Sequence, residues 1–456
     1  MLSFTKLRPG IFLLLLIPSL AVAQNVPPLD AYVQQGMEHN QAFIREQLST
    51  SLQEQLLQEA RGKYLPDITL DASYIWAEGG RLITIPAGDL INPAYRGLNQ
   101  VVGEDRFPTD IPNVSEQLLP NDFHETKIRL IQPILNTDIY YNYKAKKAQL
   151  SAQEAKQRAY ENQLVKEIKV AYYNHLSARG QRLILEDTRT LLEELLRVST
   201  KQVENNRATR EVIYGAQAEL SRLESQMARA EREENVSRIF FNQLIGRALE
   251  EEIDEAQSPE AKPYVFPDLG KLTTAALGRR SEINQLRYGL IASQAATGLS
   301  KSYIVPKINL VGDLGYQGFT YQFDDTQDFW FVQVGLTWPI FQGFQNRSRV
   351  QQSLLQERQI ESRLTEIRDM IALEVAQAYY GLEEATKTRQ ARQAERQSIA
   401  ENFRIIRKKY VQNQVPLVAF NEARNAFTTA QLQETIAQYT LKIREAELEA
   451  AIHLDD

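Results

Sequence analysis

The residue types that usually do chemistry are scarce in this sequence and show no working arrangement. The four histidines, His39, His124, His175 and His453, share no spacing that a metal site requires. The acidic run at 324–328, Asp-Asp-Thr-Gln-Asp, could bind a cation, but a solvated loop is the simpler interpretation. Cysteine is absent, and no glycine-rich phosphate loop, nucleophile elbow or His-Glu-x-x-His helix occurs. We therefore predict no catalytic residue, no metal site and no cofactor, and expect that the protein is not an enzyme.

The first residues have the pattern of a secretory signal peptide, which we assign to residues 1–23. Lys6 and Arg8 precede an apolar run, and Ala21-Val22-Ala23 ends the segment. Because these two basic residues leave with the peptide, 52 basic residues fall to 50 against 58 acidic ones, a net charge of −8. An acidic exported chain argues against nucleic-acid binding. Without cysteine, an acylated N-terminal thiol cannot anchor the chain to lipid.

The elements of this chain occur twice. Four pairs of segments align: 167–173 with 374–380 and 212–217 with 419–424 at an offset of 207, 132–135 with 338–341 at 206, and 65–70 with 305–310 at 240. Units of this length are too large for solenoid repeats, so we interpret them as two copies of one architectural unit. We place the first structural repeat at 24–258 and the second at 259–456.

Long stretches without proline predict long helices, because proline breaks a helix interior. We expect two long helical hairpins, 138–246 and 345–453, which turn near 205–209 and 413–416. A helix of about 65 residues spans roughly 100 Å, and helices this long require coiled-coil-like packing against neighbours. Shorter helices and an irregular connector complete the pattern: 29–63, 269–302 and 250–267.

Four segments alternate between apolar and polar residues and predict strands in two β-hairpins, 67–134 and 307–339. In the first segment Ile68 and Leu70 alternate with polar residues, and in the last Val334 and Trp338 do so. Period-2 alternation over about ten residues with aromatic ends is typical of outer-membrane strands. The same pattern would also fit an ordinary soluble sheet with one buried face, and we keep that as an alternative.

Four strands cannot close a barrel, since about eight are needed. No apolar run approaches the ~20 residues of a transmembrane helix, so a membrane crossing would require a closed barrel. Each chain would then supply one sector, and other copies would cover its two open edges. The loops between paired strands, 77–126 and 318–329, are rich in Gly, Pro, Asn and Asp, as loops on the outer side of such barrels are.

These segments, taken in order, resemble the outer membrane efflux protein family, the TolC-like channels. The matching motifs are 65–70 (Leu-Pro-Asp-Ile-Thr-Leu), 338–343 (Trp-Pro-Ile-Phe-Gln-Gly), 240–246, the Ala-Tyr-Tyr positions, and the residues that follow each hairpin turn. The resemblance implies a homotrimer with a shared 12-stranded β-barrel and a periplasmic α-barrel of long helices. It implies a location in the outer membrane of a Gram-negative bacterium, with contacts to outer membrane lipid. The implied partners are a periplasmic adaptor (membrane fusion) protein and an inner-membrane transporter.

The resemblance also suggests where the pore narrows, at the hairpin turns. Tyr410 matches a tyrosine that in relatives bonds to an aspartate, but that partner position here is Val212, and a basic partner position is Val415. We expect this lock to be absent or rebuilt, with Arg207, Arg210 or Glu211 as candidates. Of two acidic rings seen in relatives, the positions here are Ala419 and Glu422, so only Glu422 keeps a carboxylate.

The turns themselves are implied contacts for the adaptor, with Asn206, Asn413 and Pro416 at their tips. We expect a passive exit duct of a tripartite efflux or type I secretion system. The alternative is a periplasmic coiled-coil adaptor or structural protein, which would more often show one hairpin flanked by β domains. The sequence identifies neither the cargo nor the cognate pump.

Overall fold

The computed structural model describes residues 28–254 and 267–453. The expected signal peptide, 1–23, lies outside these residues, as does most of the expected connector at 250–267. The chain falls into two compact units. The sheet unit comprises residues 45–160 and 274–373, and the hairpin unit comprises the described residues before 45, from 161 to 273 and after 373. Each unit therefore combines residues from both sequence halves.

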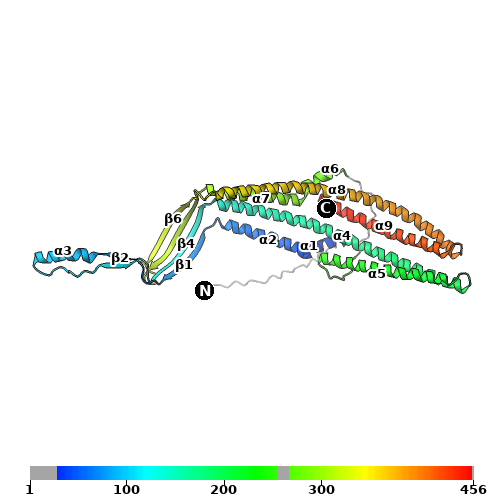
Figure 1. Ribbon diagram of the computed structural model, residues 1–456, viewed down its shortest axis with the longest axis horizontal. Helices are drawn as coiled ribbons and strands as arrows, with labels where there is room; N and C mark the ends of the chain where they lie inside the picture. Colours follow the sequence, from blue (N-terminus) through cyan, green and yellow to red (C-terminus); the bar gives the residue numbers. More distant parts are fainter. Residues whose placement is uncertain (1–27, 255–266, 454–456) are drawn as a thin grey trace, which may run out of the picture. The chain divides into compact units, whose positions relative to one another are not determined.

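A single four-stranded antiparallel sheet dominates the sheet unit, in the order β1-β4-β5-β6. Its strands are β1 (Asp67–Ile75), β4 (Phe123–Leu135), β5 (Lys307–Gly318) and β6 (Asp328–Thr337). The four strands expected from the alternation are confirmed, and Figure 1 shows them curving side by side. Within the part of the chain that the structure describes, the outermost strands, β1 and β6, each have one partner strand, so both edges of this sheet are open.

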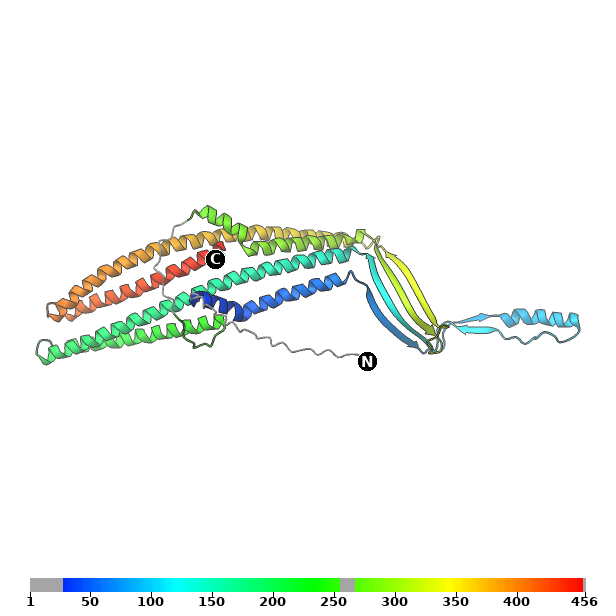
Figure 2. The same ribbon diagram turned by 180° about the vertical axis from the view of Figure 1, so that it is seen from behind.

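The connection between β1 and β4 differs from the expected loop. It contains β2 (Leu82–Ile85), α3 (Ala87–Val102) and β3 (Val114–Gln117), with β2 and β3 paired. We call residues 78–122 the arm; Figure 2 draws it as α3 on a narrow two-stranded stem. The sequence hid α3 because Gly88, Pro93 and Gly97 all lie inside it, and glycine and proline are poor helix formers.

The long helices form the two expected hairpins. The first consists of α4 (Thr137–Glu204) and α5 (Glu211–Ile245), and the second of α8 (Gln345–Val411) and α9 (Leu417–Ile452). At 68 residues, α4 spans roughly 100 Å. Ion pairs three or four residues apart, such as Arg189 with Glu193 and Lys387 with Glu383, line exposed helix faces.

The two expected shorter helices are each divided in two. The first becomes α1 (Pro28–His39) and α2 (Gln41–Gly62), and the second becomes α6 (Leu269–Arg279) and α7 (Ser281–Lys301), followed by the turn η1 (Ser302–Ile304). Asn40 explains the first division, because its side-chain oxygen accepts the backbone N–H groups of Ala42 and Phe43 as a helix N-cap. Its amide also donates to the Leu244 carbonyl and so fixes α2 to the end of α5.

The core of the hairpin unit is built from small, aliphatic and aromatic residues of all four hairpin helices. Its members are Leu185, Leu192, Leu195, Ala216, Leu223, Ala230, Phe403, Tyr410, Phe420 and Ala423. A second group of aromatic residues, Tyr32, Tyr172 and Phe241, packs α1 against α4 and α5. Tyr172 is 1% exposed, so this tyrosine is a packing residue, as its position in a helix suggested.

Candidate functional site

One face of the four-stranded sheet is apolar and exposed. The strand register places Leu70, Ile128, Leu314 and Trp330 in one row across all four strands. These four side chains are 71%, 50%, 65% and 77% exposed. The neighbouring row on this face contains Ile68, Leu130, Gly312 and Val332. An apolar surface of this extent on a soluble protein would need a partner or a non-aqueous solvent to cover it.

The opposite face carries the charges. Arg129 lies directly across from Asp313, and its guanidinium donates two hydrogen bonds of 2.9 and 2.8 Å to that carboxylate. Lys127 lies 2.8 Å from Glu125 and opposite Asp71 on β1. Such a network of paired charges suits a water-filled space and excludes hydrocarbon from this face.

A bulge in β4 changes one detail of the expected alternation. Strict alternation would put Ile134 on the same face as Ile128, but the register shifts between Pro133 and Leu135. Leu135 therefore opposes Ile308, and Ile134 has no partner in the ladder. Proline has no N–H to donate to a sheet, which explains why the irregularity starts at Pro133.

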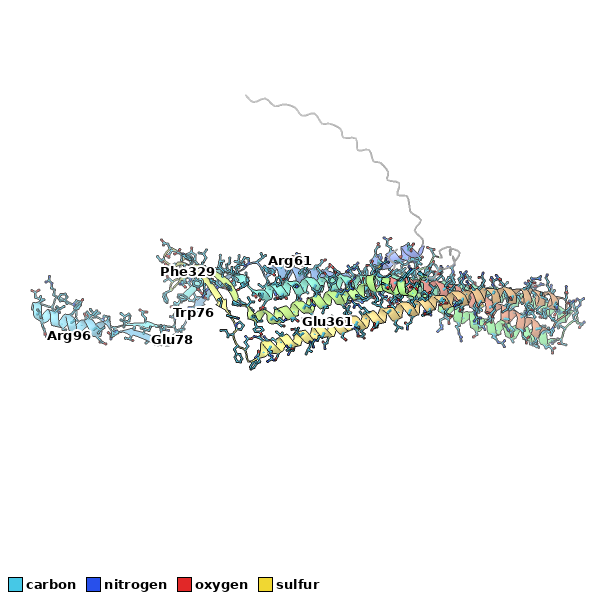
Figure 3. All side chains as sticks on the ribbon, turned by 90° about the horizontal axis from the view of Figure 1, so that it is seen from above. Arg61, Trp76, Glu78, Arg96, Phe329 and Glu361 are labelled. Atoms are coloured by element: carbon cyan, nitrogen blue, oxygen red, sulfur yellow. The ribbon has the colours of Figure 1, made fainter. Side chains whose placement is uncertain are left out.

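Aromatic residues gather at both ends of the apolar face. At the arm end, Tyr74 lies 4.6 Å from Trp76 and 6.1 Å from Tyr321 between ring centres. Figure 3 labels Trp76 and Phe329 at this end of the sheet. At the helix end, Trp338, Phe341 and Phe344 are 52%, 73% and 71% exposed. Aromatic girdles at two levels mark the interfaces of a bilayer in transmembrane strands.

The two hairpin turns have the same backbone construction. Asn206 and Asn413 both have positive φ, 56° and 58°. The next residue in each turn donates its N–H to a carbonyl five positions back, Arg207 to Gln202 and Gln414 to Lys409. This is the Schellman ending of a helix, and asparagine tolerates the left-handed conformation that it requires. Pro416 lies immediately before α9, at the N-cap position of that helix.

Polar contacts join the two hairpins near these turns. The Tyr410 hydroxyl lies 3.3 Å from the Ser199 hydroxyl, and the Gln202 amide donates to the Asn413 side-chain oxygen at 2.9 Å. Tyr410 is 4% exposed and its ring packs against Phe420. Among the described residues the hydroxyl of Tyr410 therefore contacts Ser199, and a rebuilt lock through Arg207, Arg210 or Glu211 stays a prediction.

The remaining residues of the predicted aperture lie near the start of the returning helices. Glu422 is exposed, while Ala419 and Val212 are half-buried. Ala419 and Glu422 stand three residues apart on α9, which places them on one side of that helix. In a single chain the structure brings Glu422 to a surface, and the assignment of that surface to a pore stays a prediction.

A buried ion pair was missed by the sequence reasoning. Arg424 on α9 is 3% exposed, and its guanidinium donates to Glu219 on α5 at 2.6 Å. Burial lowers the pKa of Arg424, and Glu219 acts in the opposite direction. A signal existed in the sequence, because Arg424 interrupts the apolar side of α9 between Phe420 and Phe427.

Among residues 28–254 and 267–453, no cluster of three or more His, Asp or Glu side chains is arranged to hold a metal ion. His124 is fully buried; its Nε2 lies 2.8 Å from the Gln327 side-chain oxygen, and its ring packs against Tyr321. His175 lies in the hairpin unit with its Nδ1 3.1 Å from the Ser237 hydroxyl. The acidic run is a turn in which Asp324 accepts hydrogen bonds from Thr326.

None of the described helices contains a stretch both long and apolar enough to cross a bilayer.

Comparison with known proteins supports the sequence resemblance. Residues 272–452 match the family model described as outer membrane efflux protein. No curated protein matched the chain. Three solved structures share the fold over 93% of this chain. The CmeC outer membrane channel of Campylobacter jejuni has a TM-score of 0.78, 15% identity and 85% of its own chain covered. The outer membrane protein VceC of Vibrio cholerae has a TM-score of 0.75 and 14% identity, with 95% of its chain covered. The MtrE outer membrane channel of Neisseria gonorrhoeae, in its open state, has a TM-score of 0.73 and 16% identity, with 89% of its chain covered.

Proposed function

We infer that this chain is an outer membrane efflux protein, located in the outer membrane of a Gram-negative bacterium and extending into the periplasm. The family match over 272–452 and the shared fold of several outer membrane channels support this assignment. The chain acts as a transport duct and performs no catalysis.

The observation that carries the proposal is the two-sided sheet with open edges. Its apolar face, bounded by aromatic residues, suits lipid, and its opposite face, with Arg129 paired to Asp313, suits water. Open sheet edges are not tolerated in hydrocarbon, so β1 of one copy must pair with β6 of the next. Three copies then give a closed barrel of 12 strands, above the minimum needed for closure.

The hairpins extend the duct through the periplasm. The turns at Asn206 and Asn413 end the long helices, of which α4 alone spans roughly 100 Å, and we place these turns in the periplasm. There they meet a periplasmic adaptor and, through it, an inner-membrane transporter. The duct conducts substrates passively, and the transporter supplies the energy for export.

The test combines assembly with conduction. Detergent-solubilised protein should have the mass of three chains and migrate as a large species on an unheated gel. Reconstituted into a planar bilayer, it should give discrete conductance steps. A folded, stable monomer that gives no steps would contradict the duct, and a protein recovered only in the soluble periplasmic fraction would favour a coiled-coil adaptor instead.

A further inference from the structure

Helix α3 of the arm turns polar residues toward its own chain and exposes its apolar residues. Its polar side faces its own chain: the Asn92 amide donates to the Ile111 carbonyl at 2.8 Å, and the Asn99 amide donates to the Phe107 carbonyl at 2.8 Å. Its buried residues are Gly88 and Asn99. The apolar side is left uncovered, with Leu90, Leu98 and Val101 at 71%, 44% and 86% exposed. Amphipathic helices normally bury the apolar side, so this surface requires a partner.

The arm nevertheless has a definite construction. The Asn92 and Asn99 side-chain oxygens accept backbone N–H groups of Ile111, Arg106 and Phe107. The Asn113 amide donates to Asp89 at 2.9 Å, and Gly88 lies so close to the Ile111 carbonyl that a side chain there would collide with it. Each side-chain-to-backbone bond replaces a contact that a loop would make with water. These hydrogen bonds therefore fix the orientation of α3, with its apolar side exposed.

The spacing of the apolar residues indicates which partner fits. Ala87, Ile91, Ala94, Leu98 and Val101 follow one another at intervals of 4, 3, 4 and 3 residues. This is the heptad seam through which helices of like sequence pack in a coiled coil. Rotation about a threefold axis gives every α3 the same sense along that axis and presents the same side of each.

Two further observations favour a second copy of this chain over a lipid surface. The arm begins directly after β1, the edge strand that meets the next copy in the proposed barrel, so each arm starts at a boundary between copies. The arm also carries seven acidic and three basic side chains, a net charge of −4, and contains no lysine. Helices that lie on anionic membranes are rich in Lys and Arg.

We propose that the three arms of the assembled trimer pack together through the seam of α3 formed by Ala87, Ile91, Ala94, Leu98 and Val101. This proposal rests on the trimer of the proposed function. It adds an interface outside the barrel and the hairpins, made by the arm alone.

Disulfide cross-linking tests the interface directly, because the natural chain contains no cysteine. Leu98→Cys places a thiol in the seam. Arg96→Cys, on the same helix (Figure 3), is the matched control, because residues two positions apart point to nearly opposite sides of an α-helix. Purified trimers should be reconstituted at less than one trimer per vesicle, oxidised, and run on denaturing gels. We expect a dimer band from Leu98→Cys containing at most two of every three chains, and at least a fivefold weaker band from Arg96→Cys. Adding Ile91→Asp to Leu98→Cys should reduce the dimer band several-fold.

The outcomes separate this inference from the proposed function. A trimer on unheated gels without the Leu98→Cys cross-link would overturn the arm interface and leave the duct intact. Equal cross-linking at both positions would mean that the arms collide without packing, which also overturns it. An environment-sensitive label on Leu98→Cys that responds to lipid composition, with no cross-link, would assign the surface to lipid. Absence of any trimer would overturn the proposed function and this inference together.

Discussion

Two neighbouring residues of β6 lie on opposite faces of the sheet and should respond differently to an added charge. Val334 lies on the apolar face and Gln333 on the charged face, at the same depth in the sheet. Val334→Arg should cost about 2–4 kcal/mol, because it places a charge in lipid near the midplane. The yield of trimer on unheated gels should fall accordingly.

Gln333→Arg is the matched control. The new side chain enters the face that already contains Arg129 and Asp313, so trimer yield should stay near that of the natural protein while single-channel conductance changes. Equal loss of trimer in both variants would mean that the two faces do not separate lipid from water.

The buried pair of Arg424 and Glu219 gives a second prediction. The substitution Glu219→Leu leaves the buried guanidinium of Arg424 without its carboxylate. The free energy of unfolding should fall by about 3 kcal/mol, toward the low end for buried pairs because Glu219 is partly exposed. The double variant Glu219→Leu, Arg424→Met should recover most of this loss, since apolar residues fill the space without a charge. The thermal unfolding temperature of the solubilised protein measures both. If the double variant were as unstable as the single one, packing and not charge would explain the loss.

His175 should make the hairpin unit sensitive to acid. Burial lowers the pKa of its imidazole below the usual 6.5, although Glu234 opposes the shift. As the pH falls below 6.5, the unfolded chain takes up a proton on this residue before the folded chain does, so stability is lost between 6.5 and the lowered pKa. His175→Leu should reduce the fall in unfolding temperature between neutral and mildly acidic pH. Leucine is the matched choice because Leu382, at the same position of the second hairpin, is fully buried. An unchanged fall would assign the acid sensitivity to other groups.

The helices and strands that follow from a local, regular sequence pattern were predicted correctly. Proline-free stretches located α4, α5, α8 and α9, and alternation located the four strands of the sheet. The break at Asn40 was missed because helix propensity does not show a side chain that caps the next helix. Arg280 makes no side-chain cap, and at this residue the backbone leaves the helical conformation with a ψ of 124°. The pairing of Tyr410 with Ser199 and of Arg424 with Glu219 could not be predicted, since each joins residues about 205–211 positions apart.

The arm shows the opposite limit of sequence reasoning. Its Gly, Pro and Asn residues predicted an irregular loop, which was wrong over α3, because Asn92 and Asn99 use their side chains to bond the returning chain to this helix. The same composition therefore gives an ordered element without an apolar core of its own.

The hairpin turns are the elements that should meet the adaptor. Asn206→Cys and Asn413→Cys should each form cross-links with a periplasmic partner in living cells, because both residues are exposed at the turns of the hairpins. Glu361→Cys, on α8 within the sheet unit, is a control on the same long helix as the second turn. Labelling of the turn cysteines by an impermeant reagent added outside intact cells would reverse the proposed orientation.

In the whole molecule, threefold symmetry brings copies of the same residue close together around the axis. In the proposed trimer a residue near the axis occurs three times around it. Glu422, exposed just after the Pro416 turn, is the carboxylate that the family resemblance places there. Three carboxylates around a narrow opening attract cations, and Ala419, one turn away, adds no second ring.

The open channel should therefore prefer cations, and divalent cations added on the periplasmic side should reduce its conductance. Glu422→Gln keeps the size of the side chain and removes the charge, so selectivity should fall toward neutral and the divalent block should weaken several-fold. Ala419→Glu would add the second ring and should strengthen the block. Single-channel recording in planar bilayers measures both variants against the natural protein. If selectivity and block stayed the same in Glu422→Gln, this side chain would face away from the axis, and the narrowest part of the duct would have to lie elsewhere along the hairpins.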